Sequence, residues 1–248
     1  MNYIEYGKEH KEVIVLLHGG GLSWWNYREV AEKLSSDYRV ILPILDGHTK
    51  SSCDFTSIEE NAARIIKFID EHLGGSVLLI GGLSLGGQIA LEILSQKKDI
   101  CHYALIESAM VVPSKFTYAM IKLVFGSFYG LIKYRWFSKL QFESLKIKQE
   151  LFEDYFRDTC GISKSNMIAF LEANALYCIK PSIADCYAKS FVFVGEKENR
   201  AMQKSAKKIC EALPESNLQV LHHMYHGEFS INYANNYAST VREIVKNG

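Results

Sequence analysis

The sequence predicts a doubly wound α/β fold with a mostly parallel sheet and a helical cap inserted into it. Two observations lead to this prediction. Unbroken apolar runs alternate with helical patterns near both ends of the chain, and about eighty residues of a different, helical character separate the two alternating regions. Unbroken apolar runs are typical of strands covered on both faces of a parallel sheet. Strand–helix–strand repetition then gives right-handed βαβ units.

The individual elements follow from these patterns. Strands are expected at residues 12–17, 38–45, 76–80, 103–107, 190–195 and 217–222. Helices are expected at 57–73, directly after the glycine-rich turn at 82–87, at 200–213 and at 232–246. The helix at 57–73 opens with a capping box, in which the Ser57 hydroxyl and the Glu60 carboxylate bind free backbone N–H groups.

The insertion is expected to span residues 111–188, with residues 1–110 and 189–248 forming the core. Its first half is rich in aromatic residues at helical spacing. Ligands of open α/β sheets bind outside the carboxyl ends of the strands. We therefore expect the inserted helices to cover that edge of the sheet, and some of the aromatic side chains to line an apolar pocket.

Composition and charge exclude several classes of function. The chain has 28 Lys and Arg against 28 Asp and Glu, so a net attraction for nucleic acid is not expected. No apolar run of about 18 residues is present, so no membrane span is expected. Residues 1–12 lack the pattern of a secretory leader, which favours a cytoplasmic protein. Neither Cys-x-x-Cys nor His-Glu-x-x-His occurs, so we expect no metal and no other cofactor. The sequence does not indicate an oligomeric state.

The segment Gly82-Leu83-Ser84-Leu85-Gly86-Gly87 carries the clearest sign of chemistry. It lies between a predicted strand and a predicted helix. A serine in so tight a turn is forced into a strained backbone conformation that lifts its hydroxyl clear of the sheet. Gly82 and Gly86 flank Ser84 because a Cβ at either position would collide where the helix crosses the strand. We therefore predict that Ser84 is a nucleophile.

A second glycine cluster, His18-Gly19-Gly20-Gly21, follows the first predicted strand. Acyl transfer needs donors aimed at an oxyanion, and glycines let backbone N–H groups approach closely. Gly20 and Leu85 are the expected pair of donors. A phosphate-binding loop is an alternative, but neither of the common glycine patterns of such loops is present. His18 is expected to be a structural histidine that bridges loops.

With both motifs and the order strand, cap, strand, the chain resembles the α/β-hydrolase superfamily, and in particular its small cap-bearing members that are esterase- or lipase-like serine hydrolases. The segment 39–51 adds to the resemblance, since family members usually carry Pro-Asp-x-x-Gly-His-Gly-x-Ser there. This chain departs from that pattern at Ile44 and Thr49. The resemblance covers essentially the whole chain except the cap.

The resemblance implies the chain order nucleophile, acid, histidine. His226 resembles the loop histidine of the family, which lies between the last strand and the final helix. His222 is expected within the last strand and His223 at its edge, and both remain alternatives. Glu198, in Gly195-Glu-Lys-Glu198, occupies the place of the acid after the penultimate strand. The other possible acids are Glu107 and Asp185.

These residues predict a serine hydrolase that cleaves a small carboxylic ester through an acyl-enzyme on Ser84. The expected partner is a small apolar ester, with Gly21, Trp24 and Trp25 as further walls of its pocket. The same fold supports other chemistry, so C–C bond cleavage, a lyase reaction and acyl transfer remain alternatives. A small-ligand receptor without catalysis is a third possibility.

Overall fold

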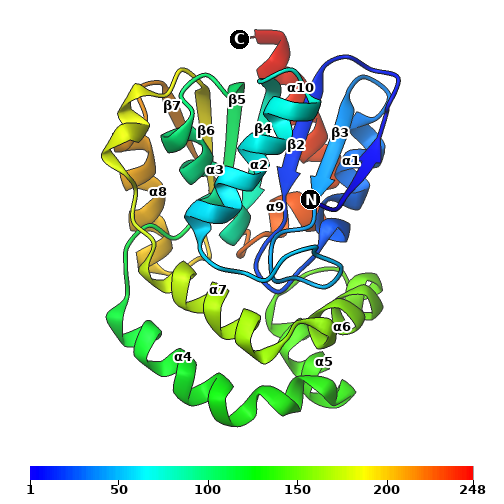
Figure 1. Cartoon of the computed structure of the whole chain (residues 1–248), viewed down its shortest axis with the longest axis vertical. Coiled ribbons are helices and arrows are strands. Elements are labelled where there is room, and N and C mark those ends of the chain that lie inside the picture. The colour runs from blue at the N-terminus through cyan, green and yellow to red at the C-terminus, as the bar shows by residue number, and fades with distance from the viewer. Residues whose placement is uncertain (248) are drawn as a thin grey trace.

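The computed structural model describes residues 1–247. Within these residues the chain forms a seven-stranded sheet with helices on both faces, and a further layer of helices lies at one end (Figure 1). The strand order is β1-β3-β2-β4-β5-β6-β7. β1 pairs with β3 in antiparallel orientation, and the other neighbouring pairs are parallel. The structure confirms the predicted fold class.

The strands agree closely with the apolar runs. They are β1 (Tyr3–Tyr6), β2 (Val13–Leu17), β3 (Arg39–Pro43), β4 (Val77–Leu83), β5 (Cys101–Glu107), β6 (Lys189–Gly195) and β7 (Ser216–Leu221). The sequence did not predict β1, because its four residues are half-buried or exposed and it lies at the edge of the sheet. The expectation that His222 belongs to the last strand is wrong, since β7 ends at Leu221 and His222 begins the following turn.

β2 shows why these runs are continuous. Val13, Val15 and Leu17 point into one buried cluster, which contains residues of the helices on one face of the sheet. Ile14 and Leu16 point into a second cluster on the other face. Because both faces of the sheet are covered, every position of β2 is buried, and apolar residues are needed throughout.

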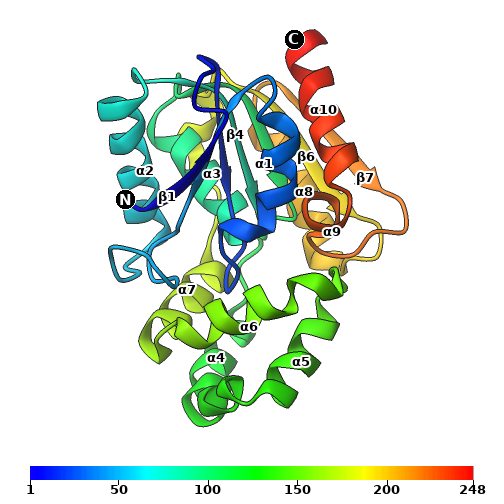
Figure 2. The same ribbon diagram turned by 90° about the vertical axis from the view of Figure 1, so that its right-hand side faces the viewer.

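Helices cover both faces of the sheet (Figure 2). α2 (Ile58–His72), α3 (Leu85–Gln96) and α8 (Arg200–Ala212) contribute to the first cluster. α1 (Arg28–Leu34), α9 (Glu228–Asn232) and α10 (Ala234–Asn247) contribute to the second. The Ser57 half of the predicted capping box is present, since the Ser57 hydroxyl accepts a hydrogen bond from the Glu60 N–H at 3.1 Å.

The segment between β5 and β6 forms the extra layer, and we call residues 111–188 the cap. Its main helices are α4 (Lys115–Phe128), α5 (Arg135–Ser144), α6 (Phe152–Gly161) and α7 (Lys164–Leu176). They lie at the lower end of the molecule in Figures 1 and 2, beyond the carboxyl ends of the parallel strands. Among residues 1–247, no helix combines the length and the apolar character that crossing a bilayer requires.

Candidate active site

Ser84 lies on the turn between β4 and α3 in a strained backbone conformation, with φ 55° and ψ −113°. Such angles are uncommon for a residue with a side chain. Two backbone hydrogen bonds hold the turn: Ser84 N–H donates to the Glu107 carbonyl at 2.9 Å, and the Ser84 carbonyl accepts from Gln88 N–H at 3.0 Å. The strain predicted for Ser84 is therefore present, and neighbouring backbone maintains it.

The glycines around Ser84 are needed for close contact between backbones. A Cβ on Gly82 would overlap the carbonyl of Gly86, and a Cβ on Gly86 would overlap the carbonyls of Leu17 and His18. Backbone atoms in a sheet and a helix cannot move aside as a flexible side chain can. The structure thus confirms the reason for which the sequence places glycine at these two positions.

His226 and Glu198 form a hydrogen-bonded pair. His226 lies in the loop between β7 and α9, and its Nδ1 is 2.7 Å from Glu198 Oε2. Glu198 Oε1 accepts hydrogen bonds from the Gly195 N–H at 2.9 Å and the Ser108 hydroxyl at 2.6 Å. The Glu198 side chain is only 3% exposed, whereas the imidazole of His226 is 43% exposed. A buried carboxylate therefore orients an accessible imidazole.

The hydrogen bonds also set the charge of Glu198. Burial alone would raise the pKa of this carboxyl group. The hydrogen bond and the charge of His226, followed by the hydrogen bonds from Ser108 and Gly195, outweigh burial and hold the pKa below its ordinary value. Glu198 is therefore an anion at neutral pH, which suits a group that orients an imidazole and stabilises its protonated form.

The alternative acids have other surroundings. Glu107 is buried at the end of β5, and its Oε1 accepts a long hydrogen bond from Ser230 N–H at 3.3 Å. Burial raises the pKa of Glu107 to about 7. Asp185 precedes β6 rather than following it, and it lines a surface hollow with Asp99 at the opposite edge of the sheet. Neither carboxyl group is hydrogen-bonded to His226 within residues 1–247.

The alternative histidines lie on the surface. The side chains of His222 and His223 are 84% and 87% exposed, and each has the carboxylate of Glu196 within 4 Å. Both belong to the turn that follows β7. The structure brings neither of them into the cavity that contains Ser84.

In the glycine loop after β2, one backbone N–H group has no acceptor within residues 1–247. Gly19 N–H donates to Asn26 Oδ1 at 3.1 Å, and Gly21 N–H donates to His48 Nε2 at 3.0 Å. Gly20 N–H, between them, has no acceptor among residues 1–247. Gly20 also lies against Leu85, since a Cβ on Gly20 would be 3.4 Å from Leu85 Cβ. Leu85 opens α3, so its N–H has no partner within the helix.

Two buried histidines hold this loop in place. His18 Nδ1 donates to the Gly19 carbonyl at 2.9 Å, and its Nε2 accepts from Leu45 N–H at 3.1 Å, so His18 bridges two loops as expected. The ring of His48 lies 4.8 Å from that of His18. Burial lowers the pKa of His18 well below its ordinary value and that of His48 to about 4. Both rings are therefore neutral at pH 7 and can accept hydrogen bonds from backbone N–H groups.

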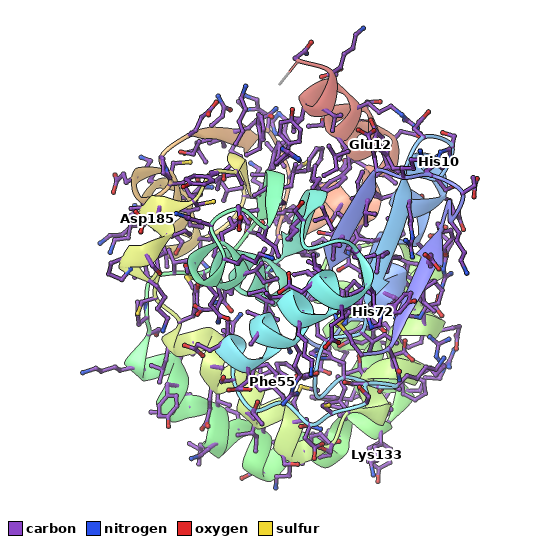
Figure 3. The ribbon with its side chains drawn as sticks, turned by 45° about the horizontal axis from the view of Figure 1, so that its top comes forward. His10, Glu12, Phe55, His72, Lys133 and Asp185 are labelled. Atoms are coloured by element: carbon purple, nitrogen blue, oxygen red, sulfur yellow. The ribbon has the colours of Figure 1, made fainter. Side chains whose placement is uncertain are left out.

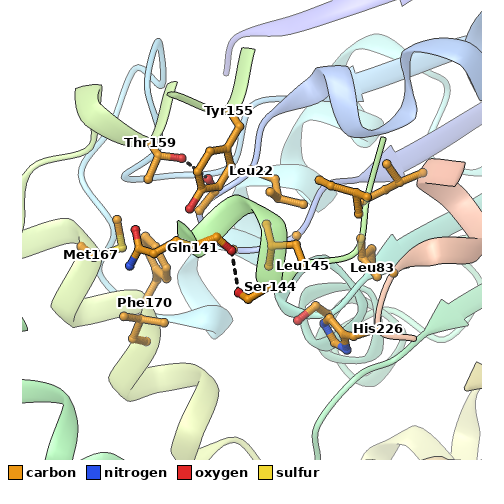
Figure 4. Close-up of a pocket in the computed structure, with 18 of the residues that line it drawn as sticks. Leu22, Leu83, Gln141, Ser144, Leu145, Tyr155, Thr159, Met167, Phe170 and His226 are labelled. Carbon is orange, nitrogen blue, oxygen red and sulfur yellow. Dashed lines mark hydrogen bonds between the residues drawn. The ribbon is translucent and has the colours of Figure 1, made fainter. Parts of the chain in front are cut away.

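A cavity of about 340 Å³ lies between the core and the cap and includes Ser84 and His226 in its lining (Figure 4). Gly20 and Gly21 form part of its wall, as expected. Most of the other side chains around it are apolar. They are Leu22, Leu83, Phe125, Ile132, Leu145, Ile147, Met167, Phe170, Leu171 and Ile231.

The expectation that Trp24 and Trp25 line this cavity is wrong. Trp25 is 1% exposed and packs in the core, and its indole N–H donates to Asp158 Oδ2 at 3.0 Å. Trp24 lies under the guanidinium of Arg28, which is 4.8 Å from the ring centre. Proximity to the glycine loop in the sequence was misleading, because the short helix 24–27 turns both rings away from the cavity.

A second hollow, of about 380 Å³, shares Ser84 and His226 with the first. Its lining is more polar and includes Ser144, Asn174, Lys197, Asn199 and Tyr225. Ser84 and His226 therefore lie where an apolar compartment meets a polar one.

Sequence reasoning missed three residues that position the site. Ser108 binds Glu198, Asn26 binds the Gly19 N–H, and the Thr159 hydroxyl donates to the Gly21 carbonyl at 3.0 Å. Ser108 and Thr159 act through contacts between distant segments, whereas Asn26 is seven residues from Gly19, and no local pattern marks any of the three. His48 had a signal, because it lies in the segment that resembles the family pattern. Within residues 1–247, no three His, Cys, Asp or Glu side chains gather closely enough to hold a metal ion.

Comparison with known proteins defines the class to which this fold and site belong. Residues 14–233 match the model of the alpha/beta hydrolase family, so the chain belongs to that family. Among curated proteins, it is 24% identical over 187 residues to epoxide hydrolase 4 of Homo sapiens, a match that covers 68% of this chain and 50% of the relative. The chain thus spans about half the length of that relative.

Solved structures show the same fold. A thermophilic esterase from Thermogutta terrifontis superposes with a TM-score of 0.79 at 18% identity, covering 99% of this chain and 93% of the esterase. The enol-lactonase from Burkholderia xenovorans LB400 superposes with a TM-score of 0.83 at 15% identity, covering 99% and 96%. At these identities the likeness shows the fold alone.

Proposed function

We propose that this protein is a serine hydrolase that cleaves a small carboxylic ester through an acyl-enzyme on Ser84. One observation carries the proposal: the strained Ser84 and the His226–Glu198 pair line the same cavity. A nucleophile, a base and a group that orients the base are the components that acyl transfer requires.

The proposed reaction uses each group in turn. Glu198 holds His226 through Nδ1, so that Nε2 can take the proton of Ser84 as its oxygen attacks the ester carbonyl. Gly20 and Leu85 N–H would bind the oxyanion, and His226 would return the proton to the leaving alcohol. Water then repeats the sequence and releases the acid. Among residues 1–247, Ser84 Oγ and His226 are not hydrogen-bonded, and such contacts often tighten only when substrate binds.

The apolar cavity and the polar hollow beside Ser84 favour an ester with an apolar acyl part and a more polar alcohol part. The apolar cavity is suited to an acyl chain, because the chain loses its contact with water there and has no polar groups that need a hydrogen-bond partner. The polar hollow on the other side of Ser84 is suited to the alcohol part, which must leave into water.

The chemistry of serine favours an ester over an epoxide, although two relatives are named epoxide hydrolases. Attack of Ser84 on an ester forms a new ester, which water can cleave. Attack on an epoxide would form an alkyl ether, which is not hydrolysed at neutral pH and would leave the enzyme inactive after one turnover. C–C bond cleavage, a lyase reaction and acyl transfer remain alternatives with the same machinery.

The test is turnover of p-nitrophenyl esters of increasing acyl length, together with covalent labelling by a fluorophosphonate. Ser84→Ala should reduce kcat by at least about a thousandfold and abolish labelling. Ser52→Ala, in an exposed loop, is the matched control and should behave like the wild type. Labelling that persists in Ser84→Ala would disprove the nucleophile. Labelling of Ser84 without turnover of any ester would instead favour the alternative chemistries.

A further inference from the structure

The outer surface of the cap exposes an unusual number of large apolar side chains. Seven of them lie on α4, on α5 and in the turn between these helices. They are Phe116, Leu123, Val124, Phe128, Tyr134, Trp136 and Leu140, and their exposed fractions run from 40% to 77%. We call this set the cap patch. Scattered exposed apolar residues are ordinary, but a concentration on two consecutive helices indicates an interaction surface.

The cap patch follows the periodicity of α4. Phe116 and Leu123 of the patch are seven residues apart, and the half-buried Met120 lies between them at intervals of four and three residues, which places all three on one side of the helix. Another side of α4 packs against the rest of the protein, because Ile121 is buried and Phe125 lines the cavity. α4 is therefore apolar on two sides, and its outer side has no partner within the described chain.

Basic residues accompany the patch. Residues 108–142 contain no Asp or Glu but have five basic residues, although the whole chain is neutral. Lys122 is paired with Glu172, and Arg135 is paired with Glu153. The remaining three are Lys115, Lys133 and Lys139, which are exposed and form no ion pair among residues 1–247.

The patch also has the right place for contact with a large flat partner. α4 and α5 form the lower end of the long axis in Figures 1 and 2, at the opposite end from the C-terminal helix α10. Lys133, between the two helices, lies at the outer edge of the molecule in Figure 3. Nothing else in the described chain extends beyond these two helices.

We propose that the cap patch docks on the surface of an anionic membrane. Phe, Trp, Tyr and Leu side chains favour the boundary between head groups and acyl chains, and nearby lysines are attracted to anionic lipids. A second copy of this chain fits less well, because a two-fold dimer would bring the same basic surfaces together. Nucleic acid would use the lysines but would leave Phe116 and Leu123 without a role. The inference goes beyond the proposed reaction and does not depend on it.

The experiment is co-sedimentation with vesicles of phosphatidylcholine, with and without phosphatidylglycerol. The wild type should partition roughly tenfold or more in favour of the anionic vesicles, and salt should weaken this preference. An apolar variant and a charge variant should each lose about tenfold or more in partitioning. The first carries Phe116→Ser, Leu123→Ser and Trp136→Ser, and the second carries Lys115→Glu, Lys133→Glu and Lys139→Glu.

Matched controls place the same changes elsewhere. One control carries Tyr3→Ser, Tyr187→Ser and Val220→Ser, three exposed apolar residues that lie outside α4 and α5, and should bind like the wild type. The other carries Lys204→Glu, Lys207→Glu and Lys208→Glu on the exposed side of α8, and should lose far less binding than the cap charge variant. Circular dichroism and thermal unfolding establish that the variants are folded.

Three results would overturn the proposal. The first is equal binding of the wild type to both kinds of vesicle, and the second is an equal loss of binding in the control variants. The third is a change of elution volume in gel filtration when the cap patch is substituted, which would show that the patch is a dimer interface. Ser84→Ala should retain full vesicle binding, so failure of the proposed reaction and failure of docking can be distinguished.

Discussion

Glu107 ends β5 and Glu198 follows the neighbouring strand β6, and both carboxyl groups are buried, yet they differ in pKa. Burial disfavours the anion in both cases. Glu198 offsets this with hydrogen bonds from His226, Ser108 and Gly195. Glu107 has one long hydrogen bond, and its Oε2 has no partner within residues 1–247. The number of donors, rather than burial, decides which of the two carboxyl groups can support a protonated imidazole.

The first prediction at the scale of single residues separates the two acids in catalysis. Glu198→Gln should lower kcat for a p-nitrophenyl ester by at least about a hundredfold, because His226 loses both its orientation and the charge that stabilises its protonated form. Glu107→Gln should change kcat by less than about threefold, since the carboxyl group bonded to His226 is that of Glu198. The reverse ranking in the same assay would assign the role of the acid to Glu107.

A second prediction concerns stability and pH. The pKa of Glu107 is about 7 in the folded chain against an ordinary value of 4.5, so the folded state holds a proton that the unfolded state releases. The protonated Glu107 carboxyl group therefore adds to the free energy of unfolding. This addition is complete below pH 4.5 and is lost as the pH rises through 7. Glu107→Gln keeps the shape without the charge. Its free energy of unfolding should therefore rise relative to the wild type by about 3 kcal/mol between pH 4.5 and pH 7.5.

Urea unfolding at both pH values measures this difference. Glu211→Gln, the same substitution at an exposed position of α8, serves as a check that removing a charge alone has little effect. The difference in free energy of unfolding between Glu107→Gln and the wild type could instead be the same at both pH values. That result would show that Glu107 is ionised in the folded chain.

Sequence reasoning at this scale predicted geometry that depends on neighbouring residues and missed geometry that depends on distant ones. The strained turn at Ser84 was predictable because glycines and a strand-to-helix turn surround it within a few positions. Ser108 and Thr159 could not be found, because their partners Glu198 and Gly21 are 90 and 138 residues away along the chain. Trp25 was misplaced for the same reason, since its partner Asp158 belongs to the cap.

At the scale of elements, the most predictable part is the unit formed by β4, the turn and α3. Its apolar run, glycines and helical pattern are consecutive, so the sequence contains all the information that the geometry needs. β1 was missed because a short edge strand is recognised mainly by its pairing with β3. The closing helix was expected at 232–246, and the structure instead has α9 followed by α10, separated at Tyr233.

The prediction for this unit uses its crowded backbone. Gly86→Ala should lower the free energy of unfolding by roughly 3 kcal/mol or more, because the added methyl group would overlap the carbonyls of Leu17 and His18. Gly126→Ala in α4 is the matched control. No atom lies within 4 Å of the position of its Cβ, so it should raise stability by about 0.5–1 kcal/mol. Denaturant unfolding of both variants measures the difference, and similar values for the two would contradict the role of crowding.

At the scale of the whole molecule, the cavity exists because the cap and the core meet over Ser84. The order of the elements predicted which edge of the sheet the insertion would cover, since the strands before and after it end at that edge. It did not predict which cap residues line the cavity. That depends on how α4, α5, α6 and α7 are rotated about their axes, and aromatic residues occur on several sides of these helices.

The last prediction tests whether the size of this cavity limits the length of the acyl chain that the protein accepts. Met167 on α7 lies across the cavity from His226 in Figure 4, so it marks the end that a long chain would reach. Met167→Trp should reduce kcat/KM for an octanoyl ester by about tenfold or more, because a buried indole would occupy that end. Turnover of the acetyl ester should change by less than about threefold, since a short acyl group stays near Ser84. Leu140→Ala, on the outer side of α5, should leave both values unchanged. If Met167→Trp lowered both esters equally, the acyl chain would occupy the polar hollow instead, and the two compartments would exchange roles.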